Sequence, residues 1–163
     1  MNSVSAQPTA THDVPPTALR GSKRILVADS DPGLCRMIVF LFEQAGHRDE
    51  TAADGELAWA ALLADDYDLL VTGRNMPKVS GLALVRRVRV AQMALPTILI
   101  SGTPAAAELS RDPWQRVDAF VRKPFTISEL LAAVHRLLPA AAPFPAATEI
   151  SREPDQRVFG RTG

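Results

Sequence analysis

The residues that could do chemistry in this chain follow short apolar runs. A carboxylate, hydroxyls and a lysine stand at the ends of four such runs, at Asp29, Ser30, residues 73–75, Ser101 and Lys123. If the runs are strands of an open parallel sheet, these residues gather beyond the carboxyl ends of the central strands, where ligands bind in such sheets. The opposite charges of Asp29 and Lys123 could then pair directly. We therefore expect the functional site at this edge of the sheet.

Other residues with reactive side chains do not form a recognisable site. The single cysteine, Cys35, excludes a disulfide framework and any cysteine-based zinc cage. Its position near the start of a predicted helix favours a packed or solvent-facing thiol over a redox centre. The three histidines, His12, His47 and His135, are scattered over an end segment, a turn and a helix. They support neither a metal site nor a phosphohistidine.

Composition and charge narrow the class of protein. With 47% hydrophobic residues among 163, the chain can bury a core. Its 18 basic and 18 acidic residues balance, which gives no electrostatic reason to expect a nucleic acid or an anionic membrane as a partner. The longest apolar run, residues 57–64, is far shorter than the roughly 20 residues that span a bilayer, and the amino terminus has no apolar signal-peptide core. We expect a cytoplasmic protein.

The chain divides into three segments. Residues 1–22 and 139–163 hold seven of the 13 prolines, interspersed with alanine, serine and threonine, and show neither helical nor alternating periodicity. We interpret both as flexible tails. Residues 23–138 carry the regular patterns and have the length of one domain.

Short apolar runs alternate with helical patterns inside residues 23–138. The runs predict strands over 24–28, 48–51, 68–72, 97–100 and 119–121, of which the polar run 48–51 suits a sheet edge. Helical patterns cover 31–46, 54–64, a stretch that begins at Ser80, a short stretch between Thr103 and Pro113, and 126–138. Five strand–helix alternations imply a parallel sheet with helices on both faces, because parallel neighbours need long right-handed crossovers.

Four segments around the predicted strand ends resemble one known family. They are ILVADSDP at 25–32, YDLLVTGRNMP at 67–77 with Gly81 following, PTILISG at 96–102 and FVRKPF at 120–125. In this order and spacing they are similar to the receiver domain of two-component response regulators, over essentially all of residues 23–138. The resemblance implies an α/β, flavodoxin-like fold, a doubly wound five-stranded parallel sheet in the order 2-1-3-4-5.

The resemblance also implies a chemistry for the sheet edge. In that family a histidine kinase supplies a phosphoryl group to an aspartate at the end of the third strand. A magnesium ion is held by that aspartate, an acidic residue after the first strand and a backbone carbonyl. By resemblance, Asp29 matches the first acid, Asn75 the carbonyl position, Ser101 the hydroxyl that binds phosphoryl oxygens, and Lys123 the lysine that does so.

Two positions depart from the family pattern. Gly73 stands where the family has its phosphoacceptor, and Ser30 stands where it has the second acid. Glycine has no oxygen that could attack phosphorus. Magnesium favours oxygen ligands that include one or two carboxylates. Counting Asp29 and Lys123 alone, the site carries −1 + 1 = 0 charge, so we expect magnesium to bind weakly or not at all, and no other cofactor.

A conformational switch is the other property that the resemblance implies. In family members the hydroxyl residue after the fourth strand moves with an aromatic residue of the last strand, and here that pair is Ser101 and Phe120. An ordinary core position explains Phe120 equally well. Trp114, in a polar segment near Pro113, is a candidate for contact with a partner.

These observations favour a stand-alone pseudo-receiver, meaning a receiver domain that is not phosphorylated at the usual position. We expect a non-enzymatic adaptor in two-component phosphorelay signalling. It would bind a histidine kinase, another receiver, an effector or a second copy of itself through protein contacts.

Alternative interpretations remain open. Asp29 could accept a phosphoryl group in place of the missing aspartate, whereas the Thr72 hydroxyl should face a helix. An engineered Gly73 would leave Ser30 unexplained. A flavodoxin-like small-molecule module has only fold analogy in its favour, since Ser30, Asp31 and Pro32 do not form a hydroxyl-rich phosphate loop.

Overall fold

Strands and helices alternate along the chain in a computed structural model that describes residues 21–103 and 113–138. The elements are β1 (Arg24–Ala28), α1 (Pro32–Gln44), β2 (Arg48–Ala52), α2 (Gly55–Ala64), β3 (Leu69–Gly73), α3 (Gly81–Val90), β4 (Thr97–Ser101), the 3₁₀ turn η1 (Pro113–Gln115), β5 (Ala119–Arg122) and α5 (Ile127–Leu137). The helix expected between Thr103 and Pro113 lies outside the described residues, as do nearly all of the expected tails.

The five strands form one parallel sheet in the order β2-β1-β3-β4-β5. This confirms the predicted fold and strand order. The polar strand β2 lies at one edge, as its sequence predicts, and the apolar strands β1, β3 and β4 lie inside. Because parallel strands end at the same edge, the residues that follow β1, β3, β4 and β5 are brought together.

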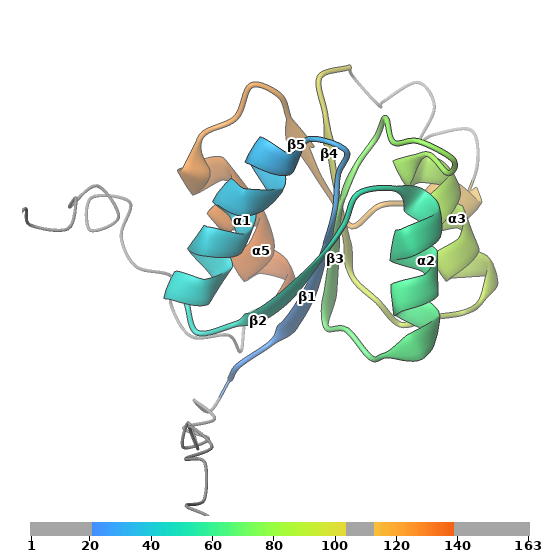
Figure 1. The fold of residues 1–163 in the computed structure, drawn as a ribbon, viewed down its shortest axis with the longest axis horizontal. Helices are drawn as coiled ribbons and strands as arrows, with labels where there is room; N and C mark the ends of the chain where they lie inside the picture. The colour runs from blue at the N-terminus through green and yellow to red at the C-terminus, as the bar shows by residue number, and fades with distance from the viewer. Residues whose placement is uncertain (1–20, 104–112, 139–163) are drawn as a thin grey trace, which may run out of the picture.

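Helices cover both faces of the sheet (Figure 1). Helices α1 and α5 pack on one face, and α2 and α3 pack on the other. Alternate residues of β1 serve the two layers: Ile25 and Val27 join the core under α1 and α5, whereas Leu26 and Ala28 join the core under α2. Each large aliphatic side chain that is fully buried contributes roughly 1.5–3 kcal/mol to folding. The sheet is therefore a rigid base for the loops at its carboxyl edge.

Capping residues fix where the two helices nearest the site begin. The Asp31 carboxylate accepts hydrogen bonds from the backbone N–H groups of Gly33, at 2.8 Å, and Leu34, at 3.2 Å, as the predicted N-cap of α1. Thr126 and Glu129 form the predicted capping box of α5. Both confirm helix starts that the sequence indicates, and the first places α1 directly after Asp29.

Strands β2, β3, β4 and β5 each end one residue later than the sequence predicts, and β3 also begins one residue later. Gly73 pairs in register with Ile100, and the N–H of Arg74 donates to the Ile100 carbonyl at 3.0 Å. Backbone hydrogen bonds set the end of a strand, and the apolar run only approximates it. Gly73 is thus the last residue of a buried strand, and its backbone is held by the sheet.

Candidate functional site

The carboxyl edge of the sheet brings together the residues that the sequence singles out. Asp29 follows β1, Gly73 ends β3, Ser101 ends β4 and Lys123 follows β5. The N–H of Lys123 donates to the Ser101 carbonyl at 2.9 Å, which continues the β4–β5 ladder into the loop. Each side chain is therefore placed by the end of a strand, where its backbone has little freedom.

Asp29 is the central charged group of this site. Its side chain is only 7% exposed, and its Oδ2 lies 3.4 Å from Lys123 Nζ. Oδ1 accepts a hydrogen bond from the Asp31 N–H at 2.9 Å. A buried carboxylate is costly unless it is paired and hydrogen-bonded, and these two contacts meet that need. The ion pair expected between Asp29 and Lys123 is present.

Gly73 leaves a space that the Asp29 carboxylate occupies. A Cβ atom added to Gly73 would lie 2.8 Å from Asp29 Cγ and closer still to Oδ2. Glycine alone among the residues permits this approach of carboxylate to backbone. The Asp29 carboxylate thus occupies the space that a side chain at residue 73 would fill.

Ser30 and Asn75 are joined by a hydrogen bond of their own. The Ser30 hydroxyl donates to the Asn75 carbonyl oxygen at 3.3 Å. By resemblance this carbonyl is a magnesium ligand, yet here it faces a hydrogen-bond donor. The Asp29 carboxylate is paired with Lys123, and the Asp31 carboxylate accepts from the backbone of α1. In residues 21–103 and 113–138 no group of three His, Cys, Asp or Glu side chains is placed to hold a metal ion. These residues do not fit magnesium, which favours carboxylate oxygens.

The two residues of the expected switch lie at neighbouring strands. Ser101 is buried, and its hydroxyl oxygen accepts from the Thr103 N–H at 3.2 Å. Phe120, in β5, is half-buried and packs against a small apolar cluster around Leu82 and Leu99. Phe120 is therefore intermediate between a core and a surface position. The Ser101 hydroxyl is hydrogen-bonded to the loop that follows it.

The remaining candidates lie apart from this site or do not react there. The Cys35 thiol is buried and donates to the Asp29 carbonyl at 3.4 Å, and burial raises its pKa, so it stays protonated. His47 accepts from the Lys23 N–H at 3.2 Å at the amino edge of the sheet, and burial lowers its pKa. Trp114 is exposed, as a contact residue must be.

One structural contact near the site has no signal in the sequence. Lys78, in the loop after β3, pairs with Asp54 at 2.6 Å, and this contact, with backbone N–H donors, holds the pKa of Asp54 below its usual range. Asp54 also caps α2. The pair ties the loop that carries Asn75 to a neighbouring helix, and only the folded structure brings these residues together.

Comparison with known proteins identifies the family. Residues 25–135 match the family model of the response regulator receiver domain. The chain belongs to this family.

The receiver is 33% identical over 120 residues to the response regulator receiver protein CpdR of Brucella abortus, covering 73% of this chain and 99% of that protein. It is 29% identical over 122 residues to the transcriptional regulatory protein TcrA of Mycobacterium tuberculosis, covering 75% of this chain but 48% of that protein. The chain thus spans about half the length of TcrA.

Solved structures agree with this assignment. The receiver resembles the response regulator TrrA of Thermotoga maritima, solved in complex with Mg²⁺ and BeF, at a TM-score of 0.64 and 31% identity over 71% of this chain and 99% of that one. It resembles a Francisella receiver domain at a TM-score of 0.67 and 28% identity, over 72% and 98% of the two chains. The protein is a response regulator receiver domain of two-component signalling. Within the described part of the chain, no helix has the length and apolar character needed to cross a bilayer.

Proposed function

We propose that this receiver transmits its signal through protein contacts, without an aspartyl phosphate at the end of β3 and without magnesium. The observation that carries the proposal is the position of the Asp29 carboxylate, which lies over Gly73 and pairs with Lys123 at 3.4 Å. The lysine that would bind a phosphoryl group already has an anionic partner. No oxygen nucleophile stands at residue 73.

Asp29 is a poor substitute acceptor. One of its oxygens accepts from the Asp31 N–H and the other faces Lys123, and the side chain is almost fully buried. Attack on phosphorus would need one of these contacts to break, and without a metal less positive charge would offset the repulsion between the carboxylate and the approaching phosphate. This supports the adaptor hypothesis over a receiver with a displaced acceptor.

The partner in this proposal is a protein: a histidine kinase, another receiver, an effector or a second copy of the chain. Ser101 and Phe120 keep the residue types of the family switch, so two arrangements remain available. Without a phosphoryl group, only a partner with different affinity for the two arrangements can shift their populations. The proposal includes a cytoplasmic location and no enzymatic activity.

Phosphoryl transfer from a small donor tests this proposal directly. After incubation of the full chain with acetyl phosphate and Mg²⁺, intact-mass spectrometry should show no added phosphoryl group. The matched positive control is the double variant Ser30→Asp/Gly73→Asp, which restores both missing carboxylates and should gain the adduct and measurable Mg²⁺ binding. A phosphoryl adduct on the wild type that disappears in Asp29→Asn would contradict the proposal.

A further inference from the structure

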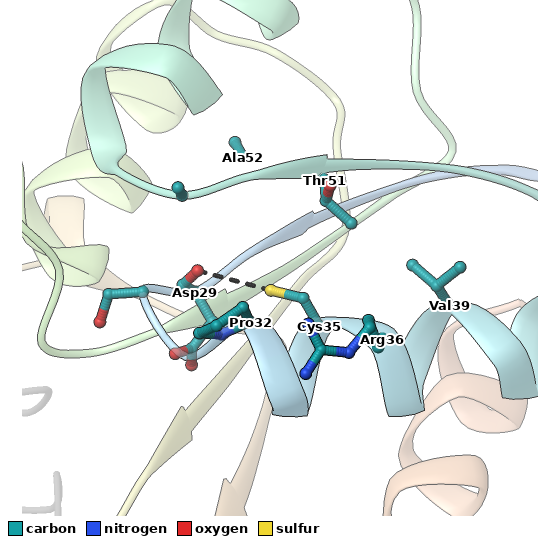
Figure 2. A pocket seen from close by; sticks show the side chains of 9 residues that line it. Asp29, Pro32, Cys35, Arg36, Val39, Thr51 and Ala52 are labelled. Carbon is teal, nitrogen blue, oxygen red and sulfur yellow. Dashed lines mark hydrogen bonds between the residues drawn. The ribbon is translucent and has the colours of Figure 1, made fainter.

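A hollow of about 440 Å³ lies beside the degenerate site, between helix α1 and strand β2 (Figure 2). Its volume is in the range of small-molecule sites, roughly 300–1,000 Å³. Its lining includes Pro32, Cys35, Arg36, Val39, Thr51 and Ala53. Asp29 and Ser30 also line it. No residue of β3, β4 or β5 lines it, so it adjoins the site of Gly73, Ser101 and Lys123 only through Asp29 and Ser30.

The walls of the hollow are mostly apolar. Pro32 and Val39 come from α1, and Ala52 and Ala53 come from the end of β2. The Asp29 carboxylate is turned toward Gly73 and Lys123, and its negative charge also acts on the Cys35 thiol of the lining. The Cys35 thiol is engaged with the Asp29 carbonyl, as the dashed line in Figure 2 shows. The body of a ligand here would therefore be apolar.

Two polar groups of the lining are available to a ligand. Within residues 21–103 and 113–138, neither the Arg36 guanidinium nor the Thr51 hydroxyl makes a hydrogen bond or an ion pair with another residue. The charge of Arg36 acts on the Asp31 carboxylate, but that carboxylate is bound to the backbone N–H groups that it caps. Arginine binds carboxylates through two parallel N–H donors, and a hydroxyl can donate a third hydrogen bond.

We propose that this hollow is a binding site for a small organic acid with an apolar body and one carboxylate. The body lies against Pro32, Val39 and Ala53, and the carboxylate reaches Arg36 and Thr51. The proposed polar contacts, to Arg36 and Thr51, do not involve Gly73, Ser101 or Lys123, although Asp29 and Ser30 also line the hollow. A ligand there would contact the segment from Asp29 to Pro32 and so have a route to the degenerate site.

Titration of the ¹⁵N-labelled full chain with 2-naphthoate and its neutral counterpart 2-naphthamide tests this site. We expect amide shifts centred on residues 30–39 and 51–53 for both probes. 2-Naphthoate should bind about fivefold more tightly or better, because only it pairs with Arg36. Arg36→Gln should reduce the affinity for 2-naphthoate to that for the amide, whereas Arg48→Gln, a change at an exposed arginine on β2, should leave both affinities unchanged.

Filling the hollow gives an independent check. Ala53→Leu adds apolar volume at an exposed position, so the variant should fold, and both probes should lose their shifts; Val39→Phe should act in the same way. Equal affinity for the two probes, an unchanged preference in Arg36→Gln, shifts centred on another surface, or no shifts at all would each overturn the proposal.

Discussion

At the scale of single residues, the site is a set of linked substitutions. The family pattern has acids at the positions that correspond to 30 and 73. In that pattern a metal ion relieves the repulsion between these two acids and the acid that corresponds to Asp29. Here both acids are gone, so Asp29 is free of that repulsion and approaches the β3 backbone and Lys123. The Ser30 hydroxyl donates a hydrogen bond to the Asn75 carbonyl. Gly73, at the position expected for the phosphoacceptor, thus coincides with an arrangement in which Asp29 is paired with Lys123.

Two glycines near the site differ in what a methyl group would displace. A Cβ at Gly73 overlaps the end of the Asp29 side chain, which can move, whereas a Cβ at Gly81 overlaps the Gly73 carbonyl oxygen in the sheet, which cannot. We predict that Gly81→Ala lowers the free energy of unfolding by about 3 kcal/mol and Gly73→Ala by about 1 kcal/mol. Urea unfolding of the two variants measures the difference.

The control for this pair is Gly102→Ala. An added Cβ there would meet only Lys123 Cβ, at 4.0 Å, which is ordinary contact. Its unfolding free energy should stay close to that of the wild type. A larger loss for Gly73→Ala than for Gly81→Ala would show that the Asp29 carboxylate is fixed more firmly than its position at the end of a side chain implies.

At the scale of elements, the sequence predicted those features that depend on interactions between residues close together in the chain. The N-caps at Asp31 and Thr126 and the buried run of β1 follow from side-chain hydrogen bonding and hydrophobic patterning within a few residues. The polar edge strand β2 was predicted for the same reason. The position of the Asp29 carboxylate and the hollow beside α1 depend on how distant elements pack, and no local pattern encodes them.

The contact that joins α3 to the amino edge of β4 and β5 is another feature that the sequence did not indicate. In the last turn of α3, the Arg89 guanidinium donates to the carbonyls of Leu95 and Arg116, at 3.0 and 3.1 Å. It also donates to Thr97 Oγ1 at 2.9 Å and to Asp118 Oδ2 at 2.6 Å. One planar, five-donor group thus links the segments that precede both strands.

Loss of this guanidinium should weaken the whole β4–β5 half of the sheet. We predict that Arg89→Met lowers the free energy of unfolding by about 2 kcal/mol, since it removes the charge-assisted hydrogen bond to Asp118 and leaves the Leu95 and Arg116 carbonyls without this donor. Arg89→Lys should recover only part of the loss, because an ammonium cannot reach four acceptors at once. Arg122→Met, at an exposed arginine of β5, is the matched control. Equal urea midpoints for Arg89→Lys and the wild type would contradict the prediction.

At the scale of the whole molecule, the amino ends and the carboxyl ends of the strands carry different kinds of charged residues. The amino edge carries partly exposed ion pairs, among them Lys23 with Asp68 at 3.0 Å and Arg24 with Asp65 at 2.9 Å. Such pairs contribute little individually. The carboxyl edge carries Asp29 with Lys123 and the hollow beside α1. Structural charge and candidate function are therefore separated across the domain.

Charge also sets how stability depends on pH. Hydrogen bonds to backbone N–H groups lower the pKa of Asp31 and Glu129, and the Arg24 guanidinium lowers that of Asp65. A carboxyl group whose pKa is lower in the folded state contributes stability above its unfolded pKa, near 4, and that contribution is lost as the pH falls further. Acid unfolding should therefore begin below about pH 4.

Asp49, in β2, acts in the opposite direction. Burial, with a further contribution from Glu43, raises its pKa to about 6. Between about pH 4 and 6 the folded state binds more protons at this residue than the unfolded state, so the destabilisation present at pH 8 is relieved on acidification.

We predict that Asp49→Asn stabilises the protein at pH 8 and that this gain disappears near pH 4. The gain should stay below about 1 kcal/mol because Asp49 is only partly buried and solvent still screens its charge. Urea unfolding of variant and wild type at each pH cancels the titration of His47, whose lowered pKa destabilises the fold as the pH drops below about 6.5. A stability difference that stays constant from pH 8 to pH 4 would show that Asp49 does not titrate as its burial requires.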